Sequence, residues 1–292
     1  MRVALVDGYN MAFRAFYGMP SLTRKDGFPT GALHGWVRSL WWIDDHIKAD
    51  RLIVFFDLGG ASRQEALQED YKANRGETPP ELIQQIPWIK EWTRAMGYLG
   101  IEKEGVEADD LIAAYAEYLG KRGDEVIVVS ADKDLAQLVN TKVSQLLPPP
   151  TANPRLGWRK LDEAGVLDKF GIGPAQIPDY LALIGDTSDN IPGLKGVGPK
   201  TAVKWLQQYR NVAGVIEFCG ELNPKRFQSL VHAEQDCLRR NLEMTMLDPD
   251  HTISDEVVMG DRPQANGARV VELLLEMEMT RSAEMGKKRF SL

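Results

Sequence analysis

The sequence predicts an α/β fold with a mostly parallel sheet flanked by helices, followed by a helical region. Short runs of aliphatic and β-branched residues alternate with stretches whose apolar residues recur at helical spacing, and this alternation is typical of parallel sheets covered on both faces. From about residue 176, helical stretches and glycine turns predominate. We therefore expect an α/β domain at 1–175 and a helical region at 176–292.

The first elements in chain order are aliphatic runs at 2–6, 51–56 and 125–129, which are typical of buried strands. A further strand is expected at 143–147, before three consecutive prolines that break regular structure. Amphipathic helices are expected at 31–48, 80–96, 108–121, 201–209, 226–244 and 268–277.

Composition narrows the class of protein. No stretch approaches the roughly 20 apolar residues that span a bilayer, and the N-terminal apolar run is too short for a signal peptide. We therefore expect a cytoplasmic protein without a membrane partner. Cys219 and Cys237 are too few for a disulfide framework or a thiolate metal site. The net charge of −7 argues against an overall basic surface, unless acidic residues that converge on one metal site conceal a basic face.

Aspartates end three of the expected strands. Asp7 ends VALVD, Asp57 ends LIVFFD, and Asp132 and Asp134 end VIVVSADKD. A lone aspartate at such a place is usually a helix cap or a turn former. In open α/β sheets, however, functional groups gather beyond the carboxyl ends of the strands. Three such strands together indicate a site at that edge.

Two further segments complete an acidic set. VEADDL begins a helix with three carboxylates that repel one another unless cations hold them, and GDTSDNIPG carries two more in a turn. The candidate metal ligands are Asp7, Asp57, Glu107, Asp109, Asp110, Asp132, Asp134, Asp186 and Asp189. Ligation by oxygen alone favours Mg²⁺ or Mn²⁺ over zinc. Two such ions suit phosphodiester hydrolysis, because one activates water and the other stabilises the leaving oxygen.

These carboxylates divide into two expected groups. Asp134, Asp186 and Asp189 support a second ion, and Asp110 fits either group. The first ion is expected at Asp7, Asp57, Glu107, Asp109 and Asp132.

Basic residues follow in two places. LKGVGPKTA is typical of a helix-hairpin-helix turn, whose backbone N–H groups hold a phosphate without reading a base. Its candidate DNA contacts are Lys195, Gly196, Gly198, Lys200, Thr201 and Lys204. The second place is YKANR with its upstream arginines, where cations near a metal site would stabilise the scissile phosphate and a tyrosine would stack on an unpaired base. The residues expected there are Arg14, Arg63, Tyr71, Lys72 and Arg75.

The ordered motifs DGYNMAFRAF, FD followed by SRQEA and YKANR, EADD, SADKDLAQL and GDTSDNIPGLKGVGPKTA resemble a known family. From residue 2 to about 292 the chain resembles the 5′-nuclease (5′-3′ exonuclease) domain of bacterial DNA polymerase I. More distantly, it is similar to bacteriophage 5′ nucleases and eukaryotic flap endonucleases. The chain stops where that nuclease domain would end, so it is expected to be either a free-standing paralogue or a fragment of a polymerase.

The resemblance implies a PIN-like core, a helical arch at about 62–96 and a helix-three-turn-helix element at 185–206, with K⁺ held by the hairpin. It also implies cleavage of DNA with a 5′ flap, a nick or a single-strand/double-strand junction, in primer removal and repair, and the same nine carboxylates and five basic or aromatic residues named above. We expect a monomer associated with the nucleoid.

Two other functions remain open at this point. A silent DNA-binding module would keep the hairpin but lack some metal carboxylates, and none is missing. A PIN-type ribonuclease acting on single-stranded RNA would have little use for a hairpin that grips a duplex backbone.

Overall fold

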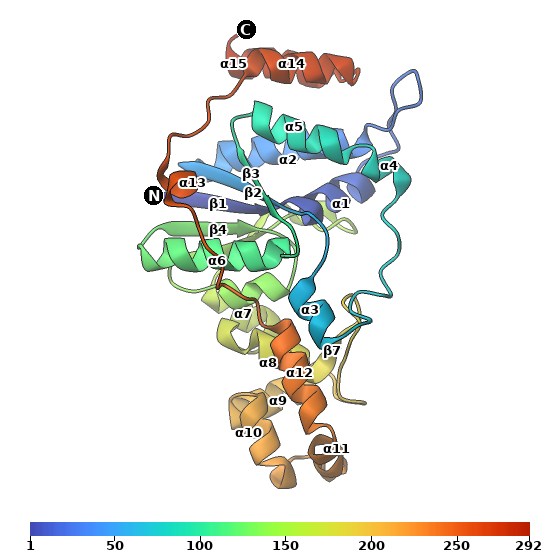
Figure 1. Ribbon diagram of the computed structural model, residues 1–292, viewed down its shortest axis with the longest axis vertical. Helices are drawn as coiled ribbons and strands as arrows, with labels where there is room; N and C mark the ends of the chain where they lie inside the picture. Colours follow the sequence, from blue (N-terminus) through green and yellow to red (C-terminus); the bar gives the residue numbers. More distant parts are fainter.

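A six-stranded sheet forms the centre of the larger part of the protein, in a computed structural model that describes residues 1–292 (Figure 1). The strands lie in the order β3-β2-β1-β4-β5-β6 and are β1 (Arg2–Asp7), β2 (Arg51–Asp57), β3 (Leu99–Lys103), β4 (Glu125–Val129), β5 (Val143–Leu147) and β6 (Arg159–Leu161). The first five are parallel, and β6 pairs with β5 in the antiparallel direction. The predicted parallel sheet and its four predicted strands are confirmed.

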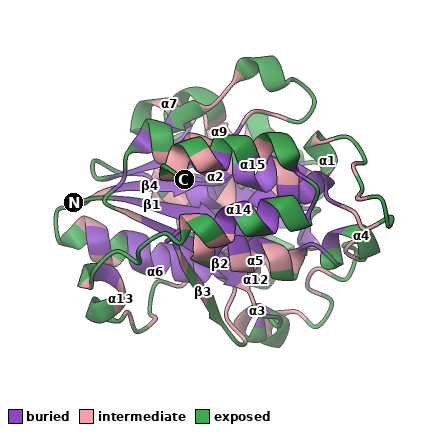
Figure 2. Ribbon diagram, turned by 90° about the horizontal axis from the view of Figure 1, so that it is seen from above, coloured by how far each residue is buried: buried purple, intermediate pink, exposed green.

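Alternate residues of the central strands pack into two hydrophobic layers, because successive side chains of a strand point to opposite faces. On one face, strand residues such as Val54 pack with helices α1 (Gly8–Gly18), α2 (Gly31–Ile47) and α5 (Ile86–Ala95). On the other face, Phe55 and its neighbours pack against α6 (Ala108–Lys121). Viewed from above, the sheet is a buried layer between these helices (Figure 2).

A second hydrophobic core lies in the smaller, lower part of the molecule, around the fully buried Trp205 (Figure 1). Its elements are α7 (Glu163–Phe170), α8 (Ile177–Ile184), α9 (Pro199–Tyr209), α10 (Val212–Glu217), α11 (Gln228–Ala233) and α12 (Gln235–Thr245). Between α8 and α9, strands β7 (Gly185–Asp186) and β8 (Ile191–Pro192) form a short antiparallel hairpin.

The end of the chain returns to the larger part of the molecule. After α13 (Asp255–Met259), helices α14 (Gly267–Glu276) and α15 (Thr280–Phe290) pack on the layer that contains α2 and α5 (Figures 1 and 2). Leu273 and Leu274 are fully buried there. The helices expected at 201–209 and 268–277 are present, whereas the single helix expected at 226–244 is divided into a 3₁₀ turn, α11 and α12. Helices α14 and α15 belong to the core of the sheet. The 3₁₀ helices are Asp134–Leu138, Pro154–Leu156, Pro174–Gln176, Cys219–Glu221 and Lys225–Phe227.

The segment expected to form an arch consists of short pieces. Helix α3 (Ser62–Leu67) contacts α12, turns occupy 69–75, and α4 (Pro80–Ile83) precedes α5. Ile89 and Trp92 of α5 are fully buried in the core of the sheet. The stretch at 68–79 therefore lies between two docked helical ends.

Candidate active site

Parallel register brings the ends of β1, β2 and β4 together at one edge of the sheet. Asp7 pairs in register with Phe55, and Val6 with Val129. Asp7 also caps α1 and accepts hydrogen bonds from the Asn10 backbone N–H at 3.0 Å and from Ser130 Oγ at 2.8 Å. Burial raises the pKa of Asp7 to about 7, with the charge of Asp132 adding to the effect.

Helix α6 brings further carboxylates to this edge through its first turn. Asp57 accepts a hydrogen bond from the Ala108 backbone N–H at 2.8 Å, which fixes the start of the helix against the end of β2. Burial, followed by the charges of Asp7, Asp132, Glu107 and Asp57, raises the pKa of Asp109 well above its ordinary value. The five carboxylates expected around the first ion therefore lie within electrostatic reach of one another. We refer to this edge with its carboxylates as the carboxylate edge.

The second expected group comes together from two distant segments. Asp134, Asp186 and Asp189 each place a carboxylate oxygen within 4.8 Å of the others. The β7–β8 hairpin makes this possible by close backbone contact: a Cβ added at Gly193 would lie 2.2 Å from the Ile184 carbonyl carbon. Only glycine fits at such a position.

The donor chemistry of this second group suits a hard cation. Asp134 Oδ1 is buried and has no hydrogen-bond partner, and an orphaned carboxylate oxygen is costly unless a cation or water satisfies it. Burial and the charges of Asp132 and Asp186 raise the pKa of Asp134 well above its ordinary value. All three ligands are oxygen atoms, so the residues fit Mg²⁺ or Mn²⁺.

The YKANR segment lies directly on both carboxylate groups. Tyr71 donates its hydroxyl to Glu107 at 3.1 Å and contacts Asp189 at 3.4 Å. Lys72 forms an ion pair with Glu107, and Arg75 with Asp189. Burial lowers the pKa of Lys72, but Glu107 and Asp189 outweigh it, and the pKa is raised. These cations offset the negative charge of the site.

Backbone contacts hold the YKANR segment in this position. The Lys72 N–H donates to the Asp189 carbonyl at 3.1 Å, and the side chain of Asn74 donates to the Thr187 carbonyl at 2.7 Å. Lys72 adopts a left-handed conformation with φ of 57°, which is uncommon for a residue with a side chain. The segment is therefore fastened to the turn between β7 and β8.

Three expected site residues have other partners. Arg14 donates to the Pro149 carbonyl and lines a cavity beside α1. Arg63 donates to the carbonyls of Glu243 at 2.7 Å and Met246 at 2.9 Å, at the end of α12. The buried Asp110 accepts from Gln64 Nε2 at 3.3 Å and from the Asp248 N–H at 2.8 Å. Their expected roles at DNA or metal stay predictions.

The structure adds two residues that the sequence did not single out. Lys133 Nζ lies 2.8 Å from Asp186 Oδ2. Burial raises the pKa of Asp186, but the hydrogen bonds from Lys133 and Ser188 outweigh it, and the pKa lies below its ordinary value. Ser130 links two members of the first group, because its Oγ donates to Asp7 and accepts from the Asp132 N–H at 3.0 Å. Both residues belong to the SADKD motif: Ser130 precedes its first aspartate, and Lys133 lies between its two aspartates.

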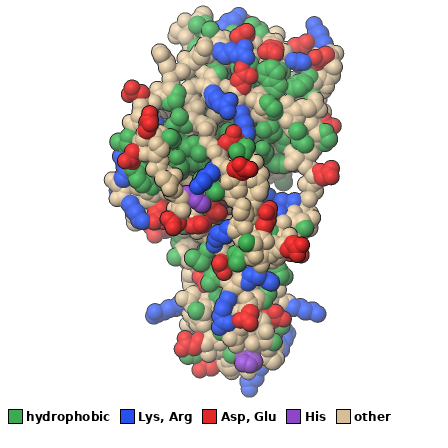
Figure 3. Space-filling model, viewed as in Figure 1, with side chains coloured by type: hydrophobic (Ala, Val, Ile, Leu, Met, Phe, Trp, Pro, Cys, Tyr) green, Lys and Arg blue, Asp and Glu red, His purple; other side chains and the backbone are tan.

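The turn at 194–198 connects β8 with α9 and belongs to the LKGVGPKTA motif; we call it the hairpin before α9, as distinct from the β7–β8 hairpin. It has the exposed residues expected of a contact to backbone phosphates. Gly196 has φ of 79°, and Gly198 precedes α9 as an N-cap residue without a side chain, so the Lys200 N–H in the first turn has no side-chain partner. Lys195, Lys200 and Lys204 are exposed and make no ion pair. Lys and Arg side chains project from this lower end of the molecule (Figure 3).

No helix of the structure has the length and apolar character needed to cross a membrane.

Several solved structures share this fold. The T5 D15 protein co-crystallised with metal ions superimposes with a TM-score of 0.69 at 22% identity, over 94% of this chain and 99% of its own. Human GEN1 in complex with Holliday junction DNA gives a TM-score of 0.60 at 13% identity, over 95% of this chain and 68% of its own. At these identities the likeness shows the fold alone. The PIN-like sheet with a hairpin-containing helical region is thereby confirmed.

Sequence comparison gives closer matches. The 5′-3′ exonuclease of Aquifex aeolicus is 36% identical over 278 residues, which cover 94% of this chain and 91% of that protein. The DNA polymerase I of Rhizobium leguminosarum is also 36% identical, but the chain spans only 27% of its length. The profile of the 5′-3′ exonuclease N-terminal resolvase-like domain matches residues 2–171, and that of the 5′-3′ exonuclease C-terminal SAM fold matches residues 172–263. The chain belongs to the 5′-3′ exonuclease family.

Proposed function

We propose that this protein is a divalent-metal-dependent, structure-specific 5′ nuclease with 5′-3′ exonuclease and flap endonuclease activity. The observation that carries the proposal is the convergence of two carboxylate groups at one edge of the sheet, with Lys72 and Arg75 placed over them. Burial makes electrostatic interactions at this edge stronger than they would be in water.

Two ions, Mg²⁺ or Mn²⁺, are the proposed cofactors. Asp134, Asp186 and Asp189 would hold one, and the carboxylates around Asp109 would hold the other. When bound, such ions supply an activated water and stabilise the leaving oxygen of a phosphodiester. Ser130 supports the group around Asp109, because its hydroxyl orients Asp7 and the backbone of Asp132.

Lys72 and Arg75 are the proposed contacts to the scissile phosphate. Each now pairs with a carboxylate of the site, so each reaches the place where a phosphate bound to the edge would lie. An ammonium and a guanidinium there stabilise negative charge that develops on phosphate oxygens. Tyr71 presents its ring beside them, suited to an unpaired base.

The hairpin is proposed to grip duplex DNA. The Lys200 N–H at the start of α9 and the exposed side chains of Lys195, Lys200 and Lys204 suit phosphates of any sequence. The carbonyl groups of the same turn are the proposed place for K⁺.

The proposed substrates are DNA with a 5′ flap, a nick or a single-strand/double-strand junction, in primer removal and repair. Structural relatives support DNA as the partner: one is a T5 D15 flap endonuclease complex with DNA and metal ions, and another is the catalytic core of Rad2 with a DNA substrate. We propose that the protein acts as a monomer at the nucleoid.

Cleavage of end-labelled substrates tests the function. We expect products from 5′-flap and nicked DNA with Mg²⁺ or Mn²⁺, no products in EDTA, and weak cutting of single-stranded RNA. Binding without cleavage under all metal conditions would make the protein a silent DNA-binding module. Preferential cutting of single-stranded RNA would make it a ribonuclease.

A further inference from the structure

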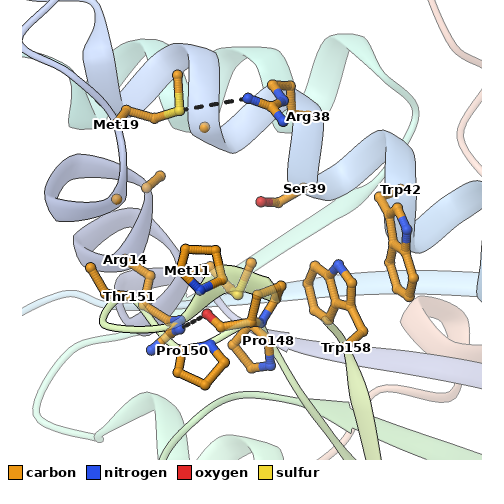
Figure 4. A pocket seen from close by; sticks show the side chains of 15 residues that line it. Met11, Arg14, Met19, Arg38, Ser39, Trp42, Pro148, Pro150, Thr151 and Trp158 are labelled. Atoms are coloured by element: carbon orange, nitrogen blue, oxygen red, sulfur yellow. Dashed lines mark hydrogen bonds between the residues drawn. The ribbon is translucent and has the colours of Figure 1, made fainter. Parts of the chain in front are cut away.

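A cavity of about 320 Å³ lies between α1, α2 and the loop that follows β5. We refer to it as the α1–α2 cavity. Arg14 lines it from α1, Arg38 and Trp42 from α2, and Trp158 from the far end of the loop (Figure 4). Strand β5 is the parallel neighbour of β4, whose end leads to Asp132. The cavity therefore adjoins the same edge of the sheet as the carboxylates.

The charge of the α1–α2 cavity is opposite to that of the carboxylate edge. No Asp or Glu lines it, although acidic residues outnumber basic ones 42 to 35 in the chain. Arg14 donates to the Pro149 carbonyl, and Arg38 faces the Met19 sulfur, a weak acceptor, at 3.8 Å. Neither guanidinium has an ion-pair partner, so both have donors left for an anion such as phosphate.

An aromatic wall stands beside these guanidinium groups. The rings of Trp158 and Trp42 stack with centroids 4.4 Å apart at 5°, and Trp42 stacks on His46 in turn. Trp158 lies between Trp42 and the prolines of the loop (Figure 4). A flat ring next to unpaired guanidinium groups suits a nucleobase and its phosphate.

Unpaired basic side chains connect the carboxylate edge with the α1–α2 cavity. The pKa of Lys169 is lowered by burial and by Arg159 and raised by Asp132, so Lys169 lies within electrostatic range of both. Burial and the charge of Arg159 also lower the pKa of Arg14. Neither Arg159 nor Lys169 forms an ion pair. Lys169 therefore lies within electrostatic range of Asp132 and Arg159, and Arg159 within range of Arg14, so these cations attract a polyanion bound near Asp132 towards the cavity.

We propose that the α1–α2 cavity is a nucleotide subsite for single-stranded DNA that adjoins the cleaved junction. The phosphate binds between Arg14 and Arg38, and the base packs against Trp158. The subsite rests on the proposed function, since it takes its DNA from a junction held at the carboxylate edge.

Binding to three substrates tests the subsite: a nicked duplex, the same duplex with a 5′ single-stranded arm, and the same duplex with a 3′ single-stranded arm. Ca²⁺ replaces Mg²⁺, and a gel after each titration verifies intact DNA. We expect Arg38→Ala to weaken the binding of one of the two substrates that carry an arm, namely the one whose arm enters the cavity. The expected loss of affinity is about tenfold, as for the loss of a charge-assisted hydrogen bond. The nicked duplex should bind the variant as it binds the wild type. Arg155→Ala, an exposed arginine outside the cavity, is the matched control.

The base contact has its own test. A series of substrates carries one abasic nucleotide each, at successive positions of the arm. The wild-type protein should bind one of them more weakly than the intact arm, and Trp158→Leu should bind that substrate and the intact arm equally. Equal affinities of Arg38→Ala and Arg155→Ala for all three substrates would overturn the proposal, as would an unchanged abasic penalty in Trp158→Leu. Cleavage by the wild-type protein with Mg²⁺ is scored separately. If the wild-type protein cuts flaps and the variants bind all three substrates normally, the proposed function stands and only the subsite is refuted.

Discussion

The carboxylate edge and the hairpin before α9 handle charge in opposite ways. At the edge, charges are buried or half-buried and crowded, and the pKa values of Asp7 and Asp109 are raised. At the hairpin, lysines are exposed and free of ion pairs. Buried charges interact strongly and are little screened, whereas exposed charges interact weakly and are screened by salt. The difference indicates that the carboxylate edge serves catalysis, whereas the hairpin serves binding to DNA.

The largest expected effect concerns the edge. Asp132→Asn or Asp109→Asn should abolish cleavage with the fold intact, because removing a ligand anion costs several kcal/mol of transition-state stabilisation, or roughly 10³-fold or more in rate. Asp179→Asn is the control, since this buried carboxylate accepts from the Val212 N–H within the helical region and is not one of the candidate ligands. Circular dichroism checks the fold, and single-turnover cleavage measures the rate. Near wild-type turnover of either ligand variant at saturating Mg²⁺ would refute the site.

Lys72 gives the next largest effect. Lys72→Ala should lower the single-turnover rate about 10²- to 10³-fold with little loss of affinity, because a cation at the phosphate favours the transition state, where charge builds up. Arg75→Ala should behave similarly. Lys121→Ala removes a lysine paired only with Glu117 on the surface and serves as the control. If Lys72→Ala cuts at the wild-type rate with enzyme in excess, the YKANR segment captures substrate without assisting the chemistry.

Repeated strand-end aspartates made much of the edge predictable. Parallel strands end at a common edge, so Asp7, Asp57 and Asp132 had to meet once the strands were identified. The YKANR segment was expected near them and lies on them. Lys133 was missed because a lysine beside carboxylates is more often part of a solvated surface.

Other placements depend on tertiary packing that no local pattern specifies. Arg14 follows Asp7 by two helical turns, about 10 Å along α1, so it reaches Pro149 rather than the carboxylates. Arg63 reaches carbonyls at the end of α12, where helices leave acceptors free. The apolar face of α14 predicted a helix but did not indicate which of the two cores would bury it.

A third prediction sharpens the electrostatic side of the comparison. Mg²⁺ should raise the melting temperature by several degrees over EDTA, because cations bound at Asp134, Asp186 and Asp189 relieve repulsion in the folded state. When the free Mg²⁺ concentration is a hundred times Kd, binding adds about 2.7 kcal/mol to the free energy of unfolding. Each kcal/mol raises the melting temperature of a large domain by about 2–4 °C. Asp134→Asn should reduce this shift, and Asp179→Asn should keep it. Equal shifts in wild type and Asp134→Asn would place the ions elsewhere.

The smallest effect concerns the hairpin. Lys200→Ala and Lys204→Ala should each weaken binding to duplex-containing DNA severalfold, without a sequence preference, because an exposed lysine contributes by releasing counterions from phosphate. Each lost contact should lower the slope of log affinity against log salt by about one unit. The single-turnover rate at saturating enzyme should stay at the wild-type value, in contrast to the Lys72 variant. Lys25→Ala, an exposed lysine on the α1–α2 loop, is the control. A fall in the saturated rate would assign the hairpin a part in the chemistry, and an unchanged salt slope in both variants would remove it from the DNA interface.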